Sequence, residues 1–203
     1  MEITKQKVRE LYEKHSKYYD LTTFLDKIFL GNKRKYLLSK AYGKVLEVGA
    51  GTGRNLPLYN EKSDVTAVDL TPAMLEVAKK RAAKLNRKVK FQVADTEELP
   101  FEDDAFDTVI DTLVLCTYPN PIQALREMAR VCNPSGLILL LEHGISNRKL
   151  LRRLQYWRED GHLKKVGCYL TRNPIKLVKE AGLDIKESKR SSFGTSYTII
   201  AKP

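Results

Sequence analysis

Short apolar runs recur along the first 141 residues and are separated by longer stretches with helical spacing. Five runs rich in aliphatic residues are found at 45–48, 65–68, 89–94, 106–113 and 137–141. Runs of this kind are typical of strands that are covered on both faces, as in parallel sheets. Two later runs, 183–189 and 197–201, alternate apolar with polar residues and are joined by a turn rich in serine, glycine and threonine. The pattern predicts an α/β protein with seven strands.

Helical spacing is found before the first strand and between the later ones. Apolar residues from Val8 to Tyr12 recur every three or four positions within residues 3–19, which predicts an amphipathic helix. Thr71 and Pro72 suit an N-cap and a first helical position. Helices are accordingly predicted over residues 72–85, 121–132, 148–158 and from Pro174 to Gly182. We expect the apolar side chains of 148–158 to join the core, and a membrane or partner surface is the alternative.

The segment 44–55 runs from a strand directly into a glycine-rich turn and then a helix. Glycines at such a turn permit positive φ and allow a ligand to approach backbone N–H groups at a helix start. A dinucleotide fingerprint requires glycine or alanine where this chain has Arg54. The turn therefore predicts a nucleotide-type pocket, and Arg54 counts against a dinucleotide as its ligand.

Candidate ligand-binding residues follow the ends of four predicted strands: Gly49, Asp69, Asp95 and Thr112. Because ligands of open parallel sheets bind outside the carboxyl ends of the strands, we expect these four residues to share one pocket. We also expect the N-terminal helix to fold over that pocket.

The sequence from Glu47 to Gly53, with Asp69 after the next strand, resembles the first motif and the ribose-binding acid of the class I S-adenosylmethionine-dependent methyltransferases. The likeness covers roughly residues 40–145 and continues in Ala94-Asp95, Leu99-Pro100-Phe101, the Pro134-x-Gly136 turn and Glu142-His143. Together with the late Gly167-Cys168 motif, it is similar to the phosphatidylethanolamine N-methyltransferase and ubiquinone-type group and to the methyltransferase-like thiol methyltransferases.

This resemblance implies a Rossmann-like, doubly wound sheet of seven strands, mostly parallel with one antiparallel strand near the C-terminus. It implies S-adenosylmethionine as cofactor, with Asp69 accepting from the ribose hydroxyls and Asp95 and Thr96 binding adenine. Met74 is placed to contact the adenine ring, and packing in the core is its alternative. The implied cofactor-binding residues are Glu47, Gly49, Ala50, Gly51, Asn55, Asp69, Leu70, Met74, Asp95, Thr96, Thr112 and Leu113.

Two residues are candidates for a direct role in catalysis. His143, at the end of the fifth strand, could accept a proton from the methyl acceptor or orient it; a buried, hydrogen-bonded histidine is the alternative. Tyr19 resembles an aromatic residue that borders the cofactor in the related group, and simple packing is its alternative. Cys116, Cys132 and Cys168 include no C-x-x-C pair, so we predict neither a disulfide framework nor a metal site.

The net charge of +11 is unevenly distributed. Residues 1–42 carry ten basic and five acidic side chains, residues 43–142 twelve and fifteen, and residues 143–203 fourteen and five. We predict a single domain of residues 1–203, in which these segments are an N-terminal helical cap, the cofactor-binding core and the acceptor side. The basic flanks suit contact with an anionic membrane surface, although a solvated surface is the alternative.

The predicted methyl acceptor is a small or lipid-borne amine or thiol, with a phosphatidylethanolamine-like head group first. An RNA methyltransferase would also use basic flanks, but the fourth strand is followed by Thr112-Leu113-Val114 rather than the Asn/Asp-Pro-Pro-Tyr motif for a flipped base. An NAD-dependent oxidoreductase is a further alternative, against which Arg54 counts. Without an apolar run of spanning length or a signal-peptide segment, we expect a cytoplasmic protein, peripheral at the membrane if the basic flanks bind lipid.

Overall fold

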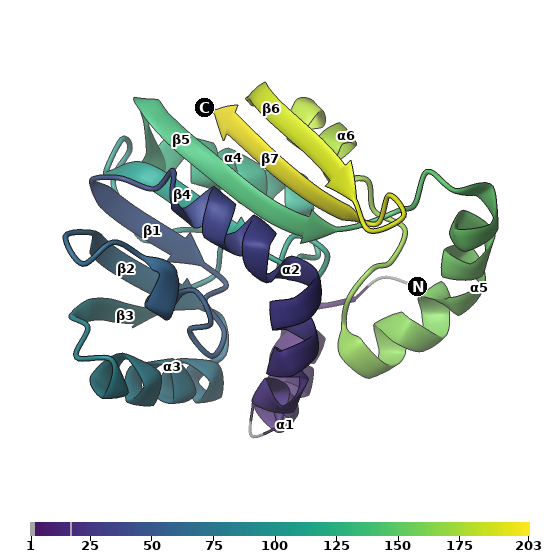
Figure 1. The fold of residues 1–203 in the computed structure, drawn as a ribbon, viewed down its shortest axis with the longest axis horizontal. Coiled ribbons are helices and arrows are strands. Elements are labelled where there is room, and N and C mark those ends of the chain that lie inside the picture. Colours follow the sequence, from purple (N-terminus) through teal and green to yellow (C-terminus); the bar gives the residue numbers. More distant parts are fainter. Residues whose placement is uncertain (1–2, 17) are drawn as a thin grey trace.

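The strands predicted from the apolar runs form one sheet in the computed structural model, which describes residues 3–16 and 18–203. Within these residues the sheet has seven strands in the order β3-β2-β1-β4-β5-β7-β6 (Figure 1). Their bounds are β1 Lys44–Val48, β2 Asp64–Asp69, β3 Val89–Val93, β4 Phe106–Thr112, β5 Cys132–His143, β6 Asp184–Ser191 and β7 Ser196–Lys202.

The first five strands are parallel, and β7 is antiparallel to both of its neighbours. The predicted fold class, including the single antiparallel strand near the C-terminus, is therefore confirmed. The strand order reverses beside β1, so the ends of β1 and β4 lie at the switch point of the sheet, where ligands of doubly wound folds bind.

Helices cover both faces of the sheet (Figure 1). Adjacent residues Val109 and Ile110 of β4 belong to different apolar clusters because successive side chains of a strand point to opposite faces. Ile110 packs with the second helix and Val109 with the fourth and sixth. The helices are α1 Lys5–His15, α2 Thr23–Leu38, α3 Pro72–Lys84, α4 Pro121–Val131, α5 Lys149–Val166 and α6 Pro174–Glu180, with short 3₁₀ turns at Tyr19–Thr22 and Leu56–Leu58.

The structure differs from the predicted boundary before β5. Asn133 to Gly136 was expected to be a turn outside the strand, but β5 begins at Cys132 and includes these residues as an irregularity in its pairing with β4. The Asn133 side chain accepts from the Ser135 backbone N–H at 2.8 Å and donates to Asp107 at 2.9 Å. The local turn therefore exists, and the hydrogen bond from Asn133 to Asp107 of β4 holds it against the sheet.

The expectation that the apolar side chains of α5 join the core is wrong for most of them. Leu150 and Trp157 are 81% and 80% exposed, and Leu154 and Tyr156 are exposed as well, whereas Leu163 is buried. The inward face of α5 is instead polar. Its Gln155 side chain donates to the carbonyls of Gly144 and Leu170, and Glu159 accepts from Leu170 and Thr171. Helical spacing gives the period of an apolar face, but it does not say whether a partner covers that face.

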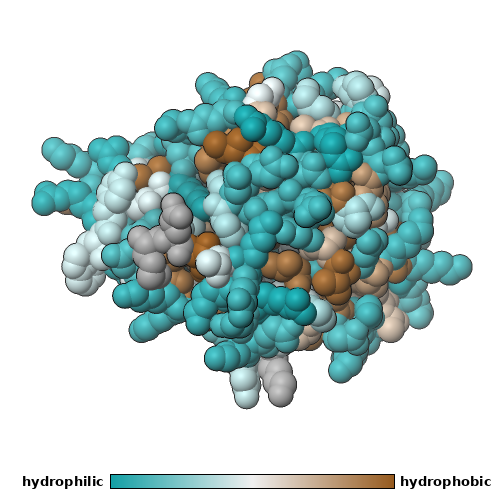
Figure 2. Space-filling model, turned by 180° about the vertical axis from the view of Figure 1, so that it is seen from behind, coloured by the Kyte–Doolittle hydropathy of each residue, from teal (hydrophilic) through white to brown (hydrophobic). Residues whose placement is uncertain are grey.

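None of the helices described in residues 3–16 and 18–203 is long and apolar enough to cross a membrane. The face seen from behind in Figure 2 is mainly hydrophilic, and apolar side chains interrupt it in small groups.

Candidate active site

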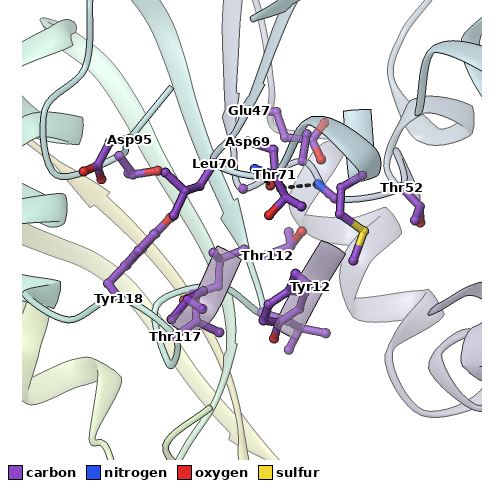
Figure 3. A pocket seen from close by; sticks show the side chains of 18 of the residues that line it. Tyr12, Glu47, Thr52, Asp69, Leu70, Thr71, Asp95, Thr112, Thr117 and Tyr118 are labelled. Carbon is purple, nitrogen blue, oxygen red and sulfur yellow. Dashed lines mark hydrogen bonds between the residues drawn. The ribbon is translucent and has the colours of Figure 1, made fainter. Parts of the chain in front are cut away.

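A pocket of about 900 Å³, its open mouth included, lies at the carboxyl ends of β1, β2 and β4. Figure 3 shows side chains from these strand ends around a common space, with Asp69 and Thr71 on one side and Tyr12 and Thr117 on the other. All twelve cofactor-binding residues predicted from the sequence line it: Glu47, Gly49, Ala50, Gly51, Asn55, Asp69, Leu70, Met74, Asp95, Thr96, Thr112 and Leu113. Their individual roles toward the cofactor stay predictions.

Asp69 joins the glycine turn to the end of β2. Its two carboxylate oxygens accept from the backbone N–H groups of Gly51 and Thr71, each at 2.8 Å. Gly51 has φ +54°, and an added Cβ would meet no atom closer than 4.0 Å, so the space beside it is open for a ligand. Gly49 has φ +57°, and its Cβ would lie 2.5 Å from Val114. Gly51 is thus placed for close ligand approach, while Gly49 is required for packing.

Glu47 is buried beneath the turn and belongs to a polar network. It accepts from the Asn55 amide at 2.9 Å and from the Tyr59 hydroxyl at 2.8 Å. Arg34 donates to Asn55 at 2.6 Å and to Thr112 at 3.1 Å, which connects α2 to the same network. Burial raises the pKa of Glu47 to about 7, although these hydrogen bonds and Arg34 oppose the shift. The network holds Asn55 and Thr112 in the pocket wall.

The segment between α1 and α2 is attached to the glycine turn by charged groups. Asp20 accepts from the Thr52 hydroxyl at 2.8 Å and from Arg81 of α3 at 2.6 Å. The guanidinium of Arg54 lies 4.5 Å from the centre of the Tyr19 ring and donates to the Tyr19 carbonyl. Tyr19 thereby lines the pocket. Arg54, which counted against a dinucleotide site, here holds the aromatic residue at the pocket.

Helix α1 lies along another side of the pocket, in agreement with its predicted position, and supplies Lys5, Val8 and Tyr12 to the wall. Lys5 pairs with Asp95 at 2.5 Å and with Glu97 at 3.0 Å. These contacts place a cation against the carboxylate that was predicted to bind adenine.

Sequence reasoning missed several pocket residues. Arg34 stands in a basic cluster, Lys33-Arg34-Lys35, that gives no sign of which side chain is buried. Tyr12 could have been found, because it lies on the apolar side of the predicted N-terminal helix. Thr117 and Tyr118 follow β4 in a turn closed by the bond from the Thr117 N–H to the Val114 carbonyl, and no motif marks them.

His143 is not among the residues that line the pocket. Its Nε2 lies 2.9 Å from the sulfur of Cys168, so this nitrogen already has a partner. Its role as proton acceptor stays a prediction, and the alternative of a hydrogen-bonded histidine matches this position.

Two buried carboxyl groups, Asp111 at the end of β4 and Glu142 at the end of β5, share a backbone donor in the pocket wall. The backbone N–H of Val114 donates to both Asp111 and Glu142, each at 3.2 Å. Burial raises the pKa of Asp111 to about 6, and burial together with the nearby Asp111 raises the pKa of Glu142 well above its usual value. Both carboxyl groups therefore ionise less readily than exposed ones. Leu113, between these groups and the pocket, has φ +63°, a strained conformation of the kind that occurs at ligand sites.

Comparisons with known proteins agree with this geometry. A family profile described as "Methyltransferase domain" matches residues 46–140. Methyltransferase OMS1, mitochondrial, of Saccharomyces cerevisiae is 28% identical over 212 residues, covering 94% of this chain and 45% of that protein. Phosphatidylethanolamine N-methyltransferase of Cereibacter sphaeroides is 37% identical over 103 residues, covering 50% of this chain and 51% of that protein. The chain thus spans about half the length of the curated relatives it matches.

The fold also matches that of solved structures. A solved structure from Thermotoga maritima, described as a SAM-dependent methyltransferase and possible histamine N-methyltransferase, superposes with a TM-score of 0.72. The match covers 96% of this chain and 99% of that chain at 20% identity, so it concerns the fold alone.

The sheet order, the glycine turn with its acidic partner and the profile match define one class of protein. The chain carries a methyltransferase domain, matched over residues 46–140, with the fold of the class I S-adenosylmethionine-dependent methyltransferases. The open space beside Gly51 and the polar residues that line the pocket fit S-adenosylmethionine as its cofactor. The alternative of an NAD-dependent oxidoreductase is therefore set aside.

Proposed function

We propose that this methyltransferase acts on a small or lipid-borne amine or thiol, with a phosphatidylethanolamine-like head group as the first candidate. The similarity to a phosphatidylethanolamine N-methyltransferase over half of the chain supports this acceptor class. The observation that carries the lipid-borne form is the outward apolar and basic face of α5.

The pocket residues have distinct tasks in this proposal. When bound, S-adenosylmethionine supplies a methyl group already activated by its positively charged sulfonium. Gly49 and Gly51 line its methionine end, Asp69 accepts from the ribose hydroxyls, and Asp95 with Thr96 binds adenine. Tyr19 and α1 enclose the pocket, so that an acceptor is held in a fixed direction toward the methyl group. Catalysis then depends chiefly on positioning.

Helix α5 has the composition of a membrane-contacting surface. Leu150, Leu154 and Trp157 recur at helical spacing and are exposed, while its polar Gln155 and Glu159 are directed at the protein. Exposed basic residues accompany the apolar ones: Arg148, Lys149, Arg152, Arg153 and Arg158. Apolar groups that enter the interface and cations that attract anionic head groups together give reversible peripheral binding. We therefore propose contact with an anionic membrane surface through α5.

The position of α5 relates this surface to the pocket. Leu163 near the end of α5 packs in one apolar cluster with Ile3 and Val8. Val8 also lines the pocket. A lipid bound along α5 would accordingly lie next to the helix that covers the pocket.

The decisive experiment is a panel assay that follows release of S-adenosylhomocysteine with phosphatidylethanolamine vesicles, a quinol, a soluble thiol and RNA as acceptors. We expect turnover with the vesicles, and Asp69→Ala supplies the control for release that does not depend on the pocket. Turnover of the soluble thiol alone would discard the lipid and keep the thiol class, whereas turnover confined to RNA would overturn the proposal. Cosedimentation with anionic and neutral vesicles at low and high salt tests membrane contact separately, and equal binding to both would contradict it.

A further inference from the structure

Three side chains far apart in the sequence converge behind the pocket: Cys116, His143 and Cys168. Cys116 lies in the loop after β4, His143 ends β5, and Cys168 follows the C-terminal glycine of α5. One ligand atom from each, two sulfurs and an imidazole nitrogen, lies within 4.8 Å of the other two. The two cysteines are buried, at 2% and 4% exposure. Cys132, the third cysteine of the chain, does not belong to this group.

The geometry points to a binding site for a thiophilic divalent ion, and we propose that Cys116, His143 and Cys168 are ligands of Zn²⁺. Two thiolates and one imidazole are a donor set that zinc prefers. In tetrahedral coordination with metal–sulfur distances of about 2.3 Å, neighbouring ligand atoms are roughly 3.7 Å apart. The three ligand atoms all lie within 4.8 Å of one another, a range that includes this separation. The distance from His143 Nε2 to the Cys168 sulfur, 2.9 Å, would have to increase slightly to admit the ion.

The charges around the cluster suit a bound cation with two thiolates. Two thiolates balance the charge of Zn²⁺, so the buried site as a whole is neutral. Arg172 adds positive charge beside the sulfurs, since it donates to the Leu115 carbonyl next to Cys116 at 2.8 Å and lies 4.0 Å from the Tyr169 ring next to Cys168. In the proposed site this positive charge would lie near the two zinc-bound sulfurs.

The site would hold three segments together at the edge of the pocket. A backbone bond from the Tyr169 N–H to the Cys116 carbonyl already joins two of them at 3.0 Å. The loop that carries Cys116 also supplies Val114 and Thr117 to the pocket wall. Zinc bound to the three residues would fix this loop against β5 and the end of α5, and would leave a fourth coordination position for an exogenous ligand.

Cobalt substitution of the 203-residue chain tests the proposal without a variant. The reduced protein is stripped with a chelator and titrated with Co²⁺, which gives thiolate charge-transfer bands and the visible bands of a tetrahedral ion when cysteines coordinate it. We expect one equivalent of Co²⁺ to bind, and one equivalent of Zn²⁺ to abolish the bands. X-ray absorption of the zinc form should show two sulfurs and one imidazole nitrogen around the metal. Absence of thiolate bands at saturating Co²⁺, or a zinc shell without sulfur, would overturn the proposal.

Variants then identify the ligands. Cys116→Ser and Cys168→Ser should each remove the charge-transfer bands while S-adenosylmethionine binding reports an intact fold. Cys132→Ser is the matched control, because Cys132 is also buried but its sulfur contacts only the Leu137 carbonyl among the hydrogen-bond partners described for it. It should retain the bands. Equal loss in Cys132→Ser, or full bands in Cys116→Ser and Cys168→Ser, would contradict the assignment.

Discussion

The glycine-turn region, residues 44–71, lines the cofactor pocket, whereas the region around Cys168 lies outside the pocket lining, and the two regions are assembled in different ways. In the first region the contacts join residues close in sequence, since Asp69 bonds Gly51 at a separation of 18 residues and Thr71 at a separation of 2. Around Cys168 the separations are larger. His143 is 25 residues away from Cys168, and Arg172 bonds Leu115 across 57. A local motif can therefore encode the cofactor side, whereas the whole fold is needed to assemble the other.

Substitution of Gly49 by alanine is expected to have the largest effect of the variants considered, a loss of unfolding free energy. In Gly49→Ala, positive φ costs roughly 1–2 kcal/mol and the overlap with Val114 roughly 1–3 kcal/mol. We expect a total loss of about 2–5 kcal/mol in unfolding free energy, measured by urea denaturation. Gly51→Ala is the control, because it shares the positive φ but meets no nearby atom. It should lose only the strain energy while weakening cofactor binding, and equal destabilisation of both variants would contradict this division.

Glu47 makes the stability of the cofactor side dependent on pH. Its pKa is about 7 in the folded chain against 4.5 as the ordinary value, so the folded state holds the proton more tightly. This stabilisation is complete below pH 4.5 and is lost as pH rises through 7. The difference in unfolding free energy between the wild type and Glu47→Gln should change across that window by on the order of 3 kcal/mol. Parallel pH curves for the two proteins would rule out the shift.

Asp69→Ala tests cofactor recognition on the same side. Loss of the carboxylate removes the acceptor of the Gly51 N–H and, in the proposed binding mode, that of the ribose hydroxyls, at a cost of roughly 1–3 kcal/mol. Affinity for S-adenosylmethionine should fall about tenfold to a hundredfold by calorimetric titration. Unchanged affinity in a folded variant would refute the role assigned to Asp69.

Leu150→Ser changes the exposed face of α5 and has the smallest expected effect. Because Leu150 is exposed, unfolding free energy should change by less than about 0.5 kcal/mol. Binding to anionic vesicles should weaken by about 1 kcal/mol, roughly fivefold, as one apolar side chain is withdrawn from the interface. Leu85→Ser at the end of α3 is the matched control and should bind vesicles as the wild type does. Trp157, the single tryptophan, reports contact through its fluorescence.

Helix α5 shows where prediction from the sequence ended. Apolar spacing located the start of this helix within one residue, but its end lay eight residues beyond the predicted one and its apolar side chains faced outward. Periodicity locates a face, and only the neighbouring elements decide whether that face is covered. Arg34 is the opposite case, since a residue in a basic cluster became part of a buried network when Asn55 and Thr112 supplied acceptors.

The sequence by itself determined the sheet, the glycine turn and the shared pocket of Gly49, Asp69, Asp95 and Thr112, because these depend on apolar periodicity and on the rule that parallel strands end at one edge. The other eight predicted pocket residues followed from the resemblance to a known family. Tertiary structure alone decided that Cys116, His143 and Cys168 meet, and that His143 lies outside the pocket wall. Their convergence depends on how β5, the loop after β4 and the end of α5 pack. No spacing along the chain records that packing, since ligand sets drawn from distant segments carry no local motif.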